Sequence, residues 1–309
     1  MIITVTLNPA IDKTIEIDEF KIGSVNRIVS TRIDAGGKGI NVSKVIKELQ
    51  HKSLALGFLG GNSGNQIKDY LDDLNIKNEF LSVKGETRTN LKIFDKINNT
   101  HTDINESGPS LVEEDITNVK QKIVGYCQGN FLVVLSGSVP SGVRGDIYGE
   151  IIKDIKSKGG KVILDADGDV LMQGIKAGPY MVKPNIDELE KAFGVSINSE
   201  DEIIETAKKI LEYGVKYVVI SKGSEGSIFI SRDKVAKVNG LKVEVKSTVG
   251  AGDSMVAAMA VAIENNYSFE ETIKLACATS TANVMTEGTQ TGRFADIEKL
   301  KKQVTINYL

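Results

Sequence analysis

The sequence predicts an α/β protein with a doubly wound, mostly parallel sheet flanked by helices. Short runs that are nearly continuous in Ile, Val, Leu and Phe recur along the chain, as is typical of strands buried on both faces. Segments with apolar residues at helical spacing lie between these runs, and such alternation indicates a parallel sheet. The 309 residues, 41% of them hydrophobic, suffice for one large core.

The individual elements follow from these patterns. Buried strands are expected at residues 2–7, 53–59, 131–136, 161–165, 180–183 and 217–221. The first clear helix follows a glycine-rich turn and repeats its apolar residues at i, i+3, i+4 and i+7; these are Val42, Val45, Ile46 and Leu49. Residues 203–211 and 255–263 show a similar pattern, so we expect helices there too.

Two regions break the alternation and predict a separate, small sheet. In them polar and apolar residues alternate, as in half-exposed strands. The segments are 14–18 with 27–33, and 89–94 with 102–105. We expect them to form a small antiparallel β-sheet lid, inserted at about 12–34 and 87–106 of a single domain spanning 1–309. Its bare edges favour pairing of two lids in a homodimer.

Composition excludes several classes of protein. With 38 basic and 41 acidic residues, the net charge is −3 and no charge run forms, so nucleic acid is not an expected partner. Two cysteines, Cys127 and Cys277, and two histidines, His51 and His101, exclude a disulfide framework, a zinc cluster and a His-dependent triad. The N-terminus lacks a signal-peptide pattern and no apolar run is long enough to span a membrane, which predicts a reduced, cytoplasmic protein.

The most informative motif is Gly250-Ala251-Gly252-Asp253, preceded by Ser247-Thr248-Val249. We expect a strand end that turns into a helix beginning near Ala251. Small residues let main chain approach a ligand, and the free N–H groups at a helix N-terminus bind anions such as phosphate. Asp253 would stand beside a bound phosphoryl group and accept a proton from an attacking hydroxyl. A glycine-rich turn whose acid complements the helix dipole is the alternative.

A second glycine-rich segment, Ala35-Gly36-Gly37-Lys38-Gly39-Ile40-Asn41, also leads into a helix. Its glycines let main chain approach a sugar, while Lys38 supplies charge and Asn41 supplies donors and acceptors. The spacing of a Walker A loop is absent. A flexible turn with a solvated lysine is the alternative interpretation of this segment.

Two further segments follow predicted strands. In Lys183-Pro184-Asn185-Ile186-Asp187-Glu188, Asn185 and Glu188 share one helix face, and an amide oxygen with a carboxylate suits Mg²⁺ or its water shell. Helix capping would also explain these residues. The segment Ser221-Lys222-Gly223-Ser224-Glu225-Gly226 has glycines that permit a hairpin or a phosphate contact.

Taken together and in this order, the four segments resemble the ribokinase-like sugar kinases of the PfkB family, and the resemblance covers essentially the whole chain. It implies a ribokinase-like fold and phosphorylation of a sugar by ATP with Mg²⁺. Asp253 would be the catalytic base, and the amides of Gly250, Ala251 and Gly252 would form the anion hole. The broad family signature starts with an acid or amide where this chain has Ser247.

The resemblance also implies binding roles for matching positions. The substrate would contact Asp12, Arg27, Gly36, Gly37, Lys38, Asn41, Arg88, Asn90 and Ser138. Among these, the residues implied to hold a phosphate on the sugar are Lys38, Arg88, Ser138 and Arg27. The nucleotide site would comprise Lys183, Asn185, Ser221, Lys222, Gly223, Gly226, Thr248 and Asn283, and Asn185 with Glu188 would govern Mg²⁺.

Within the family, residues 6–12, 25–27, 36–39 and 135–140 resemble the members that phosphorylate fructose 1-phosphate, and next those that act on tagatose 6-phosphate. The choice stays open, because discrimination of one hydroxyl's configuration depends on pocket geometry. A nucleotide-linked dehydrogenase is disfavoured because the first strand runs into Asn8-Pro9-Ala10 instead of G-x-G-x-x-G. A non-catalytic sugar- or nucleotide-sensing protein is the other alternative, although Asp253 is present.

Overall fold

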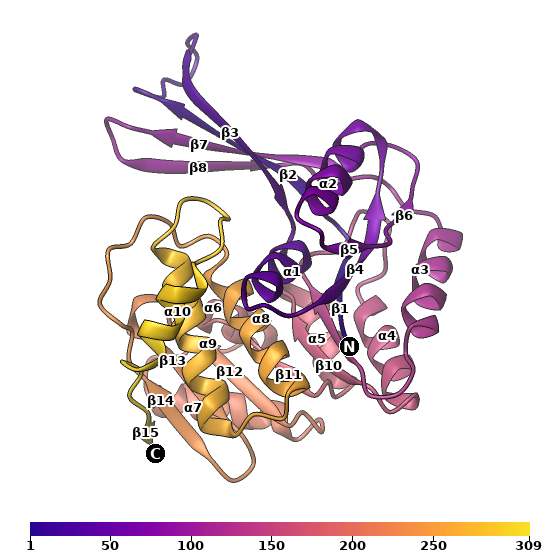
Figure 1. Ribbon diagram of the computed structural model, residues 1–309, viewed down its shortest axis with the longest axis vertical. Coiled ribbons are helices and arrows are strands. Elements are labelled where there is room, and N and C mark those ends of the chain that lie inside the picture. The colour runs from indigo at the N-terminus through magenta and orange to yellow at the C-terminus, as the bar shows by residue number, and fades with distance from the viewer.

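A large sheet runs through the body of the molecule, and the predicted buried strands form its centre (Figure 1). The computed structural model describes residues 1–309. The strands of this sheet are β1 Ile2–Thr6, β4 Ser53–Leu59, β5 Lys77–Asn78, β6 Leu81–Ser82, β9 Leu132–Ser136, β10 Lys161–Asp165, β11 Met181–Val182, β12 Tyr217–Ser221, β13 Ser227–Ile230, β14 Val235–Val238 and β15 Asn307–Tyr308. The order is β15-β14-β13-β12-β11-β10-β9-β1-β4-β5, with β6 beside β4. All pairings from β12 to β5 are parallel.

Three antiparallel strands, β13 to β15, extend one edge of this sheet and were not predicted. The segment from Ser221 to Gly226 forms the turn between β12 and β13, which is the hairpin that its glycines permit. Gly226 has φ of 102°, and a side chain there would collide with the carbonyl group of Val238 in β14. Glycine at this position is therefore explained by the fold alone.

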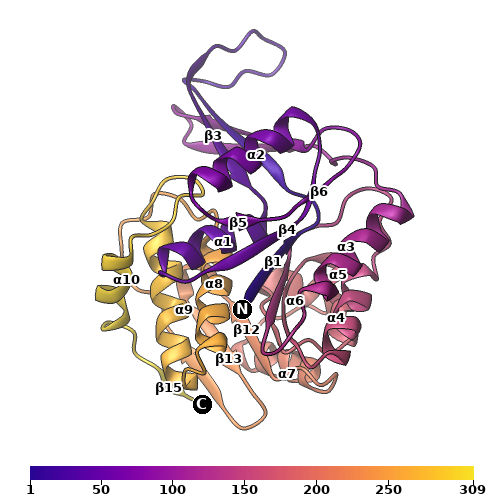
Figure 2. The ribbon, with the colours of Figure 1, turned by 45° about the vertical axis from the view of Figure 1, so that its right-hand side comes forward.

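Helices cover both faces of the large sheet (Figure 2). One face carries α3 Glu113–Gly125, α4 Ile147–Ser157, α5 Gly168–Lys176, α6 Ile186–Phe193 and α7 Glu200–Leu211, and the other carries α1 Lys38–Glu48, α8 Ala251–Glu264, α9 Phe269–Val284 and α10 Phe294–Lys301. Alternate strand residues enter the two layers: Ile3 and Val5 pack on one side, and Ile2 on the other. Burial on both sides explains the continuous apolar runs. None of these helices has the length and apolar character to cross a membrane.

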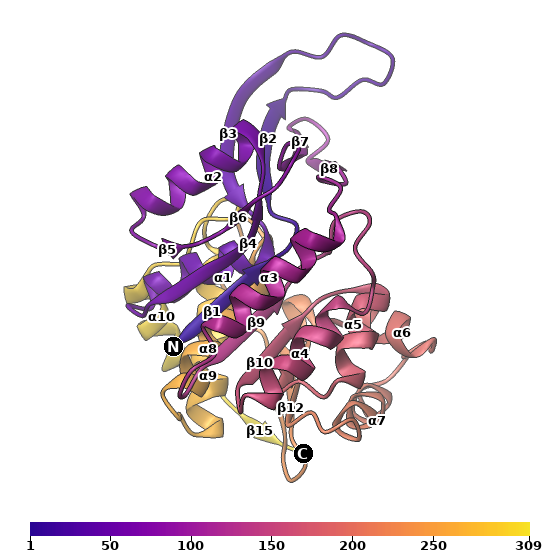
Figure 3. The same cartoon turned by 90° about the vertical axis from the view of Figure 1, so that its right-hand side faces the viewer.

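A second, four-stranded sheet projects from one end of the body and forms the predicted lid (Figure 3). Its strands are β2 Ala10–Ile17, β3 Ile28–Gly36, β7 Arg88–Asp95 and β8 Thr100–Asn105, in the order β3-β2-β7-β8. Both predicted hairpins are antiparallel, but β2 and β7 pair in parallel, which corrects the expectation of a wholly antiparallel sheet. The reason is that both strands leave the body in the same direction. Helix α2, Gly61–Asp73, packs against the base of the lid.

The carboxyl ends of the parallel strands meet at the base of the lid, where ligands bind in folds of this class. Helix α8 begins at Ala251, as expected. The strand expected immediately before it is absent, however, and residues 239–250 are irregular. The main-chain N–H groups of Lys246 and Ser247 donate to the Val284 carbonyl at the end of α9, so a helix end holds this segment in place of a neighbouring strand.

Candidate active site

The segment before α8 forms a helix N-terminus that is open to an anion. Gly250 caps the helix with φ of 80°, in the left-handed region that favours glycine. The first N–H groups of a helix have no intrahelical acceptors, so those of Gly252 and Asp253 are available at this end of α8. The Ala251 N–H makes only a long hydrogen bond, of 3.4 Å, to the Thr248 carbonyl oxygen. The ammonium group of Lys183 lies 3.2 Å from the point where a Gly252 side chain would begin. The turn thus combines main-chain donors with a cation, as a phosphate site requires.

Asp253 lies in the first turn of α8 and is buried. Its Oδ2 accepts a hydrogen bond of 2.8 Å from Nδ2 of Asn41 on α1, so the two glycine-rich segments meet at this carboxylate. Burial raises the pKa of Asp253 to about 6, and the nearby charge of Asp165 adds to this effect. A carboxylate with such a pKa, beside an anion site, is suited to accept a proton near neutral pH.

Asp165 was not predicted as a site residue, yet it lies between two of the predicted lysines. Its Oδ1 is 3.3 Å from Nζ of Lys38 and 3.4 Å from Nζ of Lys183. Burial alone would raise the pKa of Asp165, but these ammonium groups hold it below its usual value. The carboxylate in turn raises the pKa of Lys38. The one sequence feature that marks Asp165 is its position as an acid at the end of a buried strand.

The base of the lid contributes a second polar cluster. Asn90 Nδ2 donates to Oδ1 of Asp12 at 2.9 Å, and Lys92 Nζ lies 3.7 Å from Oδ2 of the same carboxylate. A side chain at Gly36 would collide with Asp12, so glycine leaves room for the carboxylate. Gly37, with φ of 112°, passes close to Pro9. The predicted sugar-binding residues of β2, β7 and the turn before α1 therefore adjoin one another.

Arg88 supplies a cation without an acidic partner at the same place. Its guanidinium group donates to the carbonyl oxygens of Asn8 at 3.1 Å and Glu106 at 3.3 Å, and its Nε is buried with no acceptor. Asn8 Nδ2 is 3.5 Å from Oγ of Ser138. This end of the site is thus positive and rich in hydrogen-bond donors.

Asn185 and Glu188 form a capping box at the start of α6. Asn185 Oδ1 accepts from the Glu188 N–H at 2.7 Å, and Glu188 Oε2 accepts from the Asn185 N–H at 2.9 Å. The other carboxylate oxygen, Oε1, lies 3.9 Å from Nζ of Lys38. The capping interpretation is therefore correct, and it leaves one oxygen of Glu188 facing the site.

The remaining residues that were predicted to bind the nucleotide divide into two groups. Ser221 forms a β-bridge with Asn185, and Asn283 presents its Oδ1, which has no hydrogen-bond partner, close to Gly250. Asn283 therefore adjoins the anion turn, whereas Ser221 adjoins the start of α6. The ammonium group of Lys222, in contrast, forms ion pairs with Glu200 at 3.0 Å and Glu225. Exposed Thr248 precedes the anion turn, and Gly223 lies in the exposed hairpin turn.

Arg27 is separated from the other predicted substrate residues. It is exposed and directly precedes β3 at the distal end of the lid, whereas Asp12 and Asp34 pair near the base. Ile17, the partner of Ile28, lies five positions after Asp12, which is about 17 Å along the strand. Arg27 therefore does not join the phosphate-binding cluster within one chain.

Lys44 is a further buried cation that the sequence interpretation missed. Its Nζ donates to the Ala35 carbonyl in β3 at 3.1 Å and to Oγ1 of Thr289 at 3.4 Å, so it links the base of the lid to the loop after α9. Burial lowers the pKa of Lys44 to about 8. In the sequence, Lys44 is marked only by its position among the apolar residues on the buried face of α1.

The sequence of this chain is similar to those of known carbohydrate kinases. The model of the pfkB family of carbohydrate kinases matches residues 5–295. This chain belongs to the PfkB family. The 1-phosphofructokinase of Borreliella burgdorferi is 39% identical over 307 residues, which cover 99% of this chain and 98% of that protein. The tagatose-6-phosphate kinase of Staphylococcus epidermidis is 34% identical over 307 residues, covering 97% of this chain and 98% of that protein.

The fold agrees with that of solved members of the PfkB family. Phosphofructokinase-2 from Escherichia coli, crystallised in complex with potassium, superposes with a TM-score of 0.93 at 28% identity and covers 98% of each chain. The expectations of a ribokinase-like fold and of a carbohydrate kinase are thus confirmed. This PfkB kinase is a phosphotransferase, and members of its family use ATP as the phosphoryl donor.

Proposed function

We propose that this kinase phosphorylates a ketohexose phosphate, most specifically fructose 1-phosphate, to give fructose 1,6-bisphosphate. The 6-hydroxyl oxygen attacks the γ-phosphorus of ATP while the bond to the leaving oxygen of ADP breaks, and the hydroxyl proton passes to Asp253. The N–H groups of Gly250, Ala251 and Gly252 bind the transferring phosphoryl group, and Lys183 adds positive charge beside them. Positioning and charge stabilisation supply most of the rate in such reactions.

The observation that carries the proposal is the guanidinium group of Arg88, which has no carboxylate partner and whose buried Nε has no acceptor. A buried donor without an acceptor costs free energy, which an incoming anion would offset. Arg88 lies beside Asn8, and Asn8 adjoins Ser138, so a phosphate on the sugar would find several donors there. Lys38 contributes positive charge, part of which Asp165 neutralises. Asp12, Asn41 and Asn90 would hold the hydroxyl groups between the two phosphates.

The residues at the nucleotide end fit Mg²⁺ held largely by phosphate oxygens. This ion commonly keeps several waters and takes one or two protein carboxylates. Asp165 Oδ2 is buried without a hydrogen-bond partner, and Glu188 retains one oxygen outside its capping box. When bound, Mg²⁺ would neutralise negative charge on the phosphates. Asn185 orients Glu188 through the capping box.

Tagatose 6-phosphate is the second candidate substrate, giving tagatose 1,6-bisphosphate, because the kinase of Staphylococcus epidermidis named for it is similar along nearly the whole chain. We favour fructose 1-phosphate because the 1-phosphofructokinase of Borreliella burgdorferi has the higher identity. Steady-state assays with ATP and Mg²⁺ would compare kcat/KM for the two sugars. A higher value for tagatose 6-phosphate would reverse the assignment, and no turnover of either sugar would contradict the proposal.

We further propose that two copies associate through their lids. Strand β3 forms an unpaired sheet edge, and its apolar side chains Ile28, Val29 and Ile33 are each more than half exposed. Bare edges and exposed apolar side chains favour pairing with another chain. A homodimer would bury both features.

A further inference from the structure

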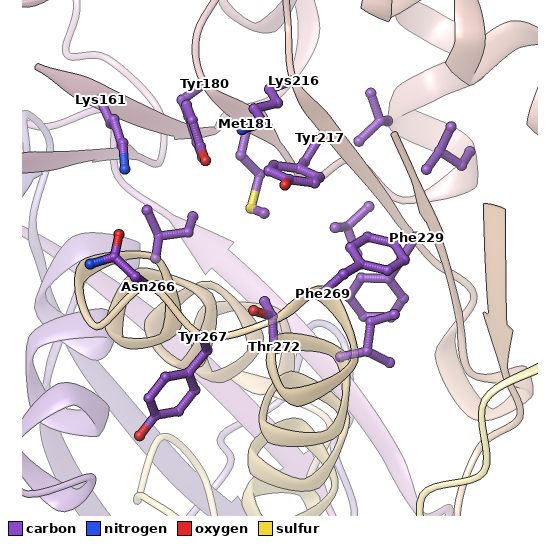
Figure 4. Close-up of a pocket in the computed structure, with 15 residues that line it drawn as sticks. Lys161, Tyr180, Met181, Lys216, Tyr217, Phe229, Asn266, Tyr267, Phe269 and Thr272 are labelled. Carbon is purple, nitrogen blue, oxygen red and sulfur yellow. The ribbon is translucent and has the colours of Figure 1, made fainter. Parts of the chain in front are cut away.

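An aromatic cavity lies at the opposite end of the main sheet from the active site. Its volume is about 240 Å³, and it is bounded by the first residues of β10, β11 and β12 on one side and by the end of α8 and the start of α9 on the other (Figure 4). Asp253 and Ile263 lie near the two ends of α8 and are about 15 Å apart along the helix axis. The cavity is therefore separate from the phosphoryl-transfer site.

Most residues that line this cavity are hydrophobic, and several of them carry aromatic rings. Met181 and Phe229 line it and are almost fully buried. The ring of Tyr217 stacks with that of Phe269, with centroids 6.0 Å apart and an interplanar angle of 22°. Figure 4 shows the thioether of Met181 pointing into the cavity beside the ring of Tyr217. Rings and thioethers of this kind pack well against a planar ligand.

The charged residues of the cavity are both lysines. Nζ of Lys161 lies 5.0 Å from the ring centroid of Tyr180, and Nζ of Lys216 lies 5.4 and 5.5 Å from those of Tyr180 and Tyr217. Neither ammonium group forms an ion pair, and no acidic side chain lines the cavity. The cavity therefore combines mostly hydrophobic lining residues with two ammonium groups that have no carboxylate partner.

We propose that this cavity binds a small planar anion, namely an aromatic or heteroaromatic ring that carries a carboxylate, sulfonate or phosphate group. The ring would pack against Met181, Tyr217 and Phe269, and the anionic group would pair with Lys161 and Lys216. Cavities that bind small molecules combine apolar walls with a few convergent polar groups in this way. Charge complementarity with the two lysines selects an anion over a neutral ring of the same shape.

The proposal is tested with a matched pair of probes, 2-naphthoate and 2-naphthamide, which share a ring system and differ in charge. Ligand-observed NMR titration of the wild-type protein is expected to show at least about tenfold tighter binding of 2-naphthoate, the scale of one partly exposed charge-assisted contact. Equal affinities, or no binding of either probe, would overturn the proposal.

Substitutions then locate the probe. The double variant Lys161→Gln, Lys216→Gln keeps two polar side chains of similar length and should abolish the preference for 2-naphthoate. Lys208→Gln, an exposed lysine of α7 outside the cavity, should keep it. Thermal melting would verify that both variants are folded. An unchanged preference in the double variant, or displacement of 2-naphthoate by ATP with Mg²⁺, would place the probe elsewhere and refute the assignment.

Discussion

Asp253 illustrates how the fold sets the chemistry of one carboxyl group. Its place in the first turn of α8 puts it beside the anion turn, and its hydrogen bond to Asn41 fixes its orientation toward α1. Burial raises its pKa to about 6, so at neutral pH the group is mostly ionised yet still basic enough to take a proton. These properties arise from tertiary contacts that the local sequence does not contain.

The first prediction is that Asp253→Asn lowers kcat by at least about 10²-fold, because a positioned general base is lost. The amide has nearly the same shape, so ATP binding and the fold should persist. Stopped-time product assays and calorimetric ATP titrations would measure the two properties. Retention of near wild-type kcat would show that Asp253 is not the base.

The second prediction concerns pH. Protonation of Asp253 removes the base, so kcat/KM of the wild-type protein should fall as the pH decreases through about 6. Because the folded-state pKa exceeds the unfolded value of about 3.9, the stability that this group contributes is lost as the pH rises through 6. Unfolding in urea at pH 5 and pH 7 should therefore show Asp253→Asn gaining stability relative to wild type at the higher pH. A difference independent of pH would contradict the raised pKa.

At the scale of elements, the start of α6 combines helix capping with a proposed role in binding Mg²⁺. Asn185 and Glu188 cap the helix, while one carboxylate oxygen of Glu188 faces Lys38. The same capping box occurs at α9, where Ser268 and Glu271 exchange the equivalent bonds far from the anion turn. The two helices therefore provide a matched pair for separating capping from ligand binding.

The third prediction is that Glu188→Gln raises the Mg²⁺ concentration needed for half-maximal rate, since glutamine can keep the capping box but lacks the charge. Glu271→Gln should leave the Mg²⁺ titration unchanged. Measuring the initial rate against Mg²⁺ for both variants distinguishes the roles. Identical titration curves would assign Glu188 to capping alone.

Elements that produce a local sequence pattern could be predicted, whereas features that depend on contacts between distant segments could not. The buried strands and α8 were predictable because continuous apolar runs and a small-residue helix start are local patterns. The parallel pairing of β2 and β7 was not predictable, because Ala10 and Arg88 become neighbours only in the folded chain. Asp165 was missed for the same reason, because its lysine partners come from positions 38 and 183. Arg27 was predicted from a family motif to bind the substrate phosphate, but the motif does not show that this residue lies at the distal end of the lid.

The whole molecule consists of an α/β body and a lid that carries part of the proposed sugar site. Arg32 on β3 lies against Gly288 and 3.7 Å from Glu287, so the lid rests on the loop after α9 as well as on α2. The outer edge of β3 has no such support. Association through that edge would therefore also fix the geometry of the substrate residues on the lid.

The fourth prediction is that Val29→Glu converts a dimer into a monomer, because a charge on the edge of β3 opposes pairing. Val29 is 53% exposed, and Val245, which is 58% exposed and belongs to the body, provides the control Val245→Glu. Sedimentation velocity would give the molecular mass of each. A wild-type protein that sediments as a monomer, or a Val29→Glu dimer, would contradict association through the lid.

Arg88 decides whether the site recognises a phosphate already present on the sugar. The measurement is kcat/KM for fructose 1-phosphate and for free fructose, in wild type, in Arg88→Ala and in Arg232→Ala, an exposed arginine between β13 and β14. We predict that wild type prefers fructose 1-phosphate by orders of magnitude. Arg88→Ala should lose about 2–4 kcal/mol of transition-state stabilisation with that sugar alone, while Arg232→Ala behaves as wild type. Comparable activity of the wild-type protein on free fructose, or a loss in Arg88→Ala confined to ATP affinity, would contradict the claim.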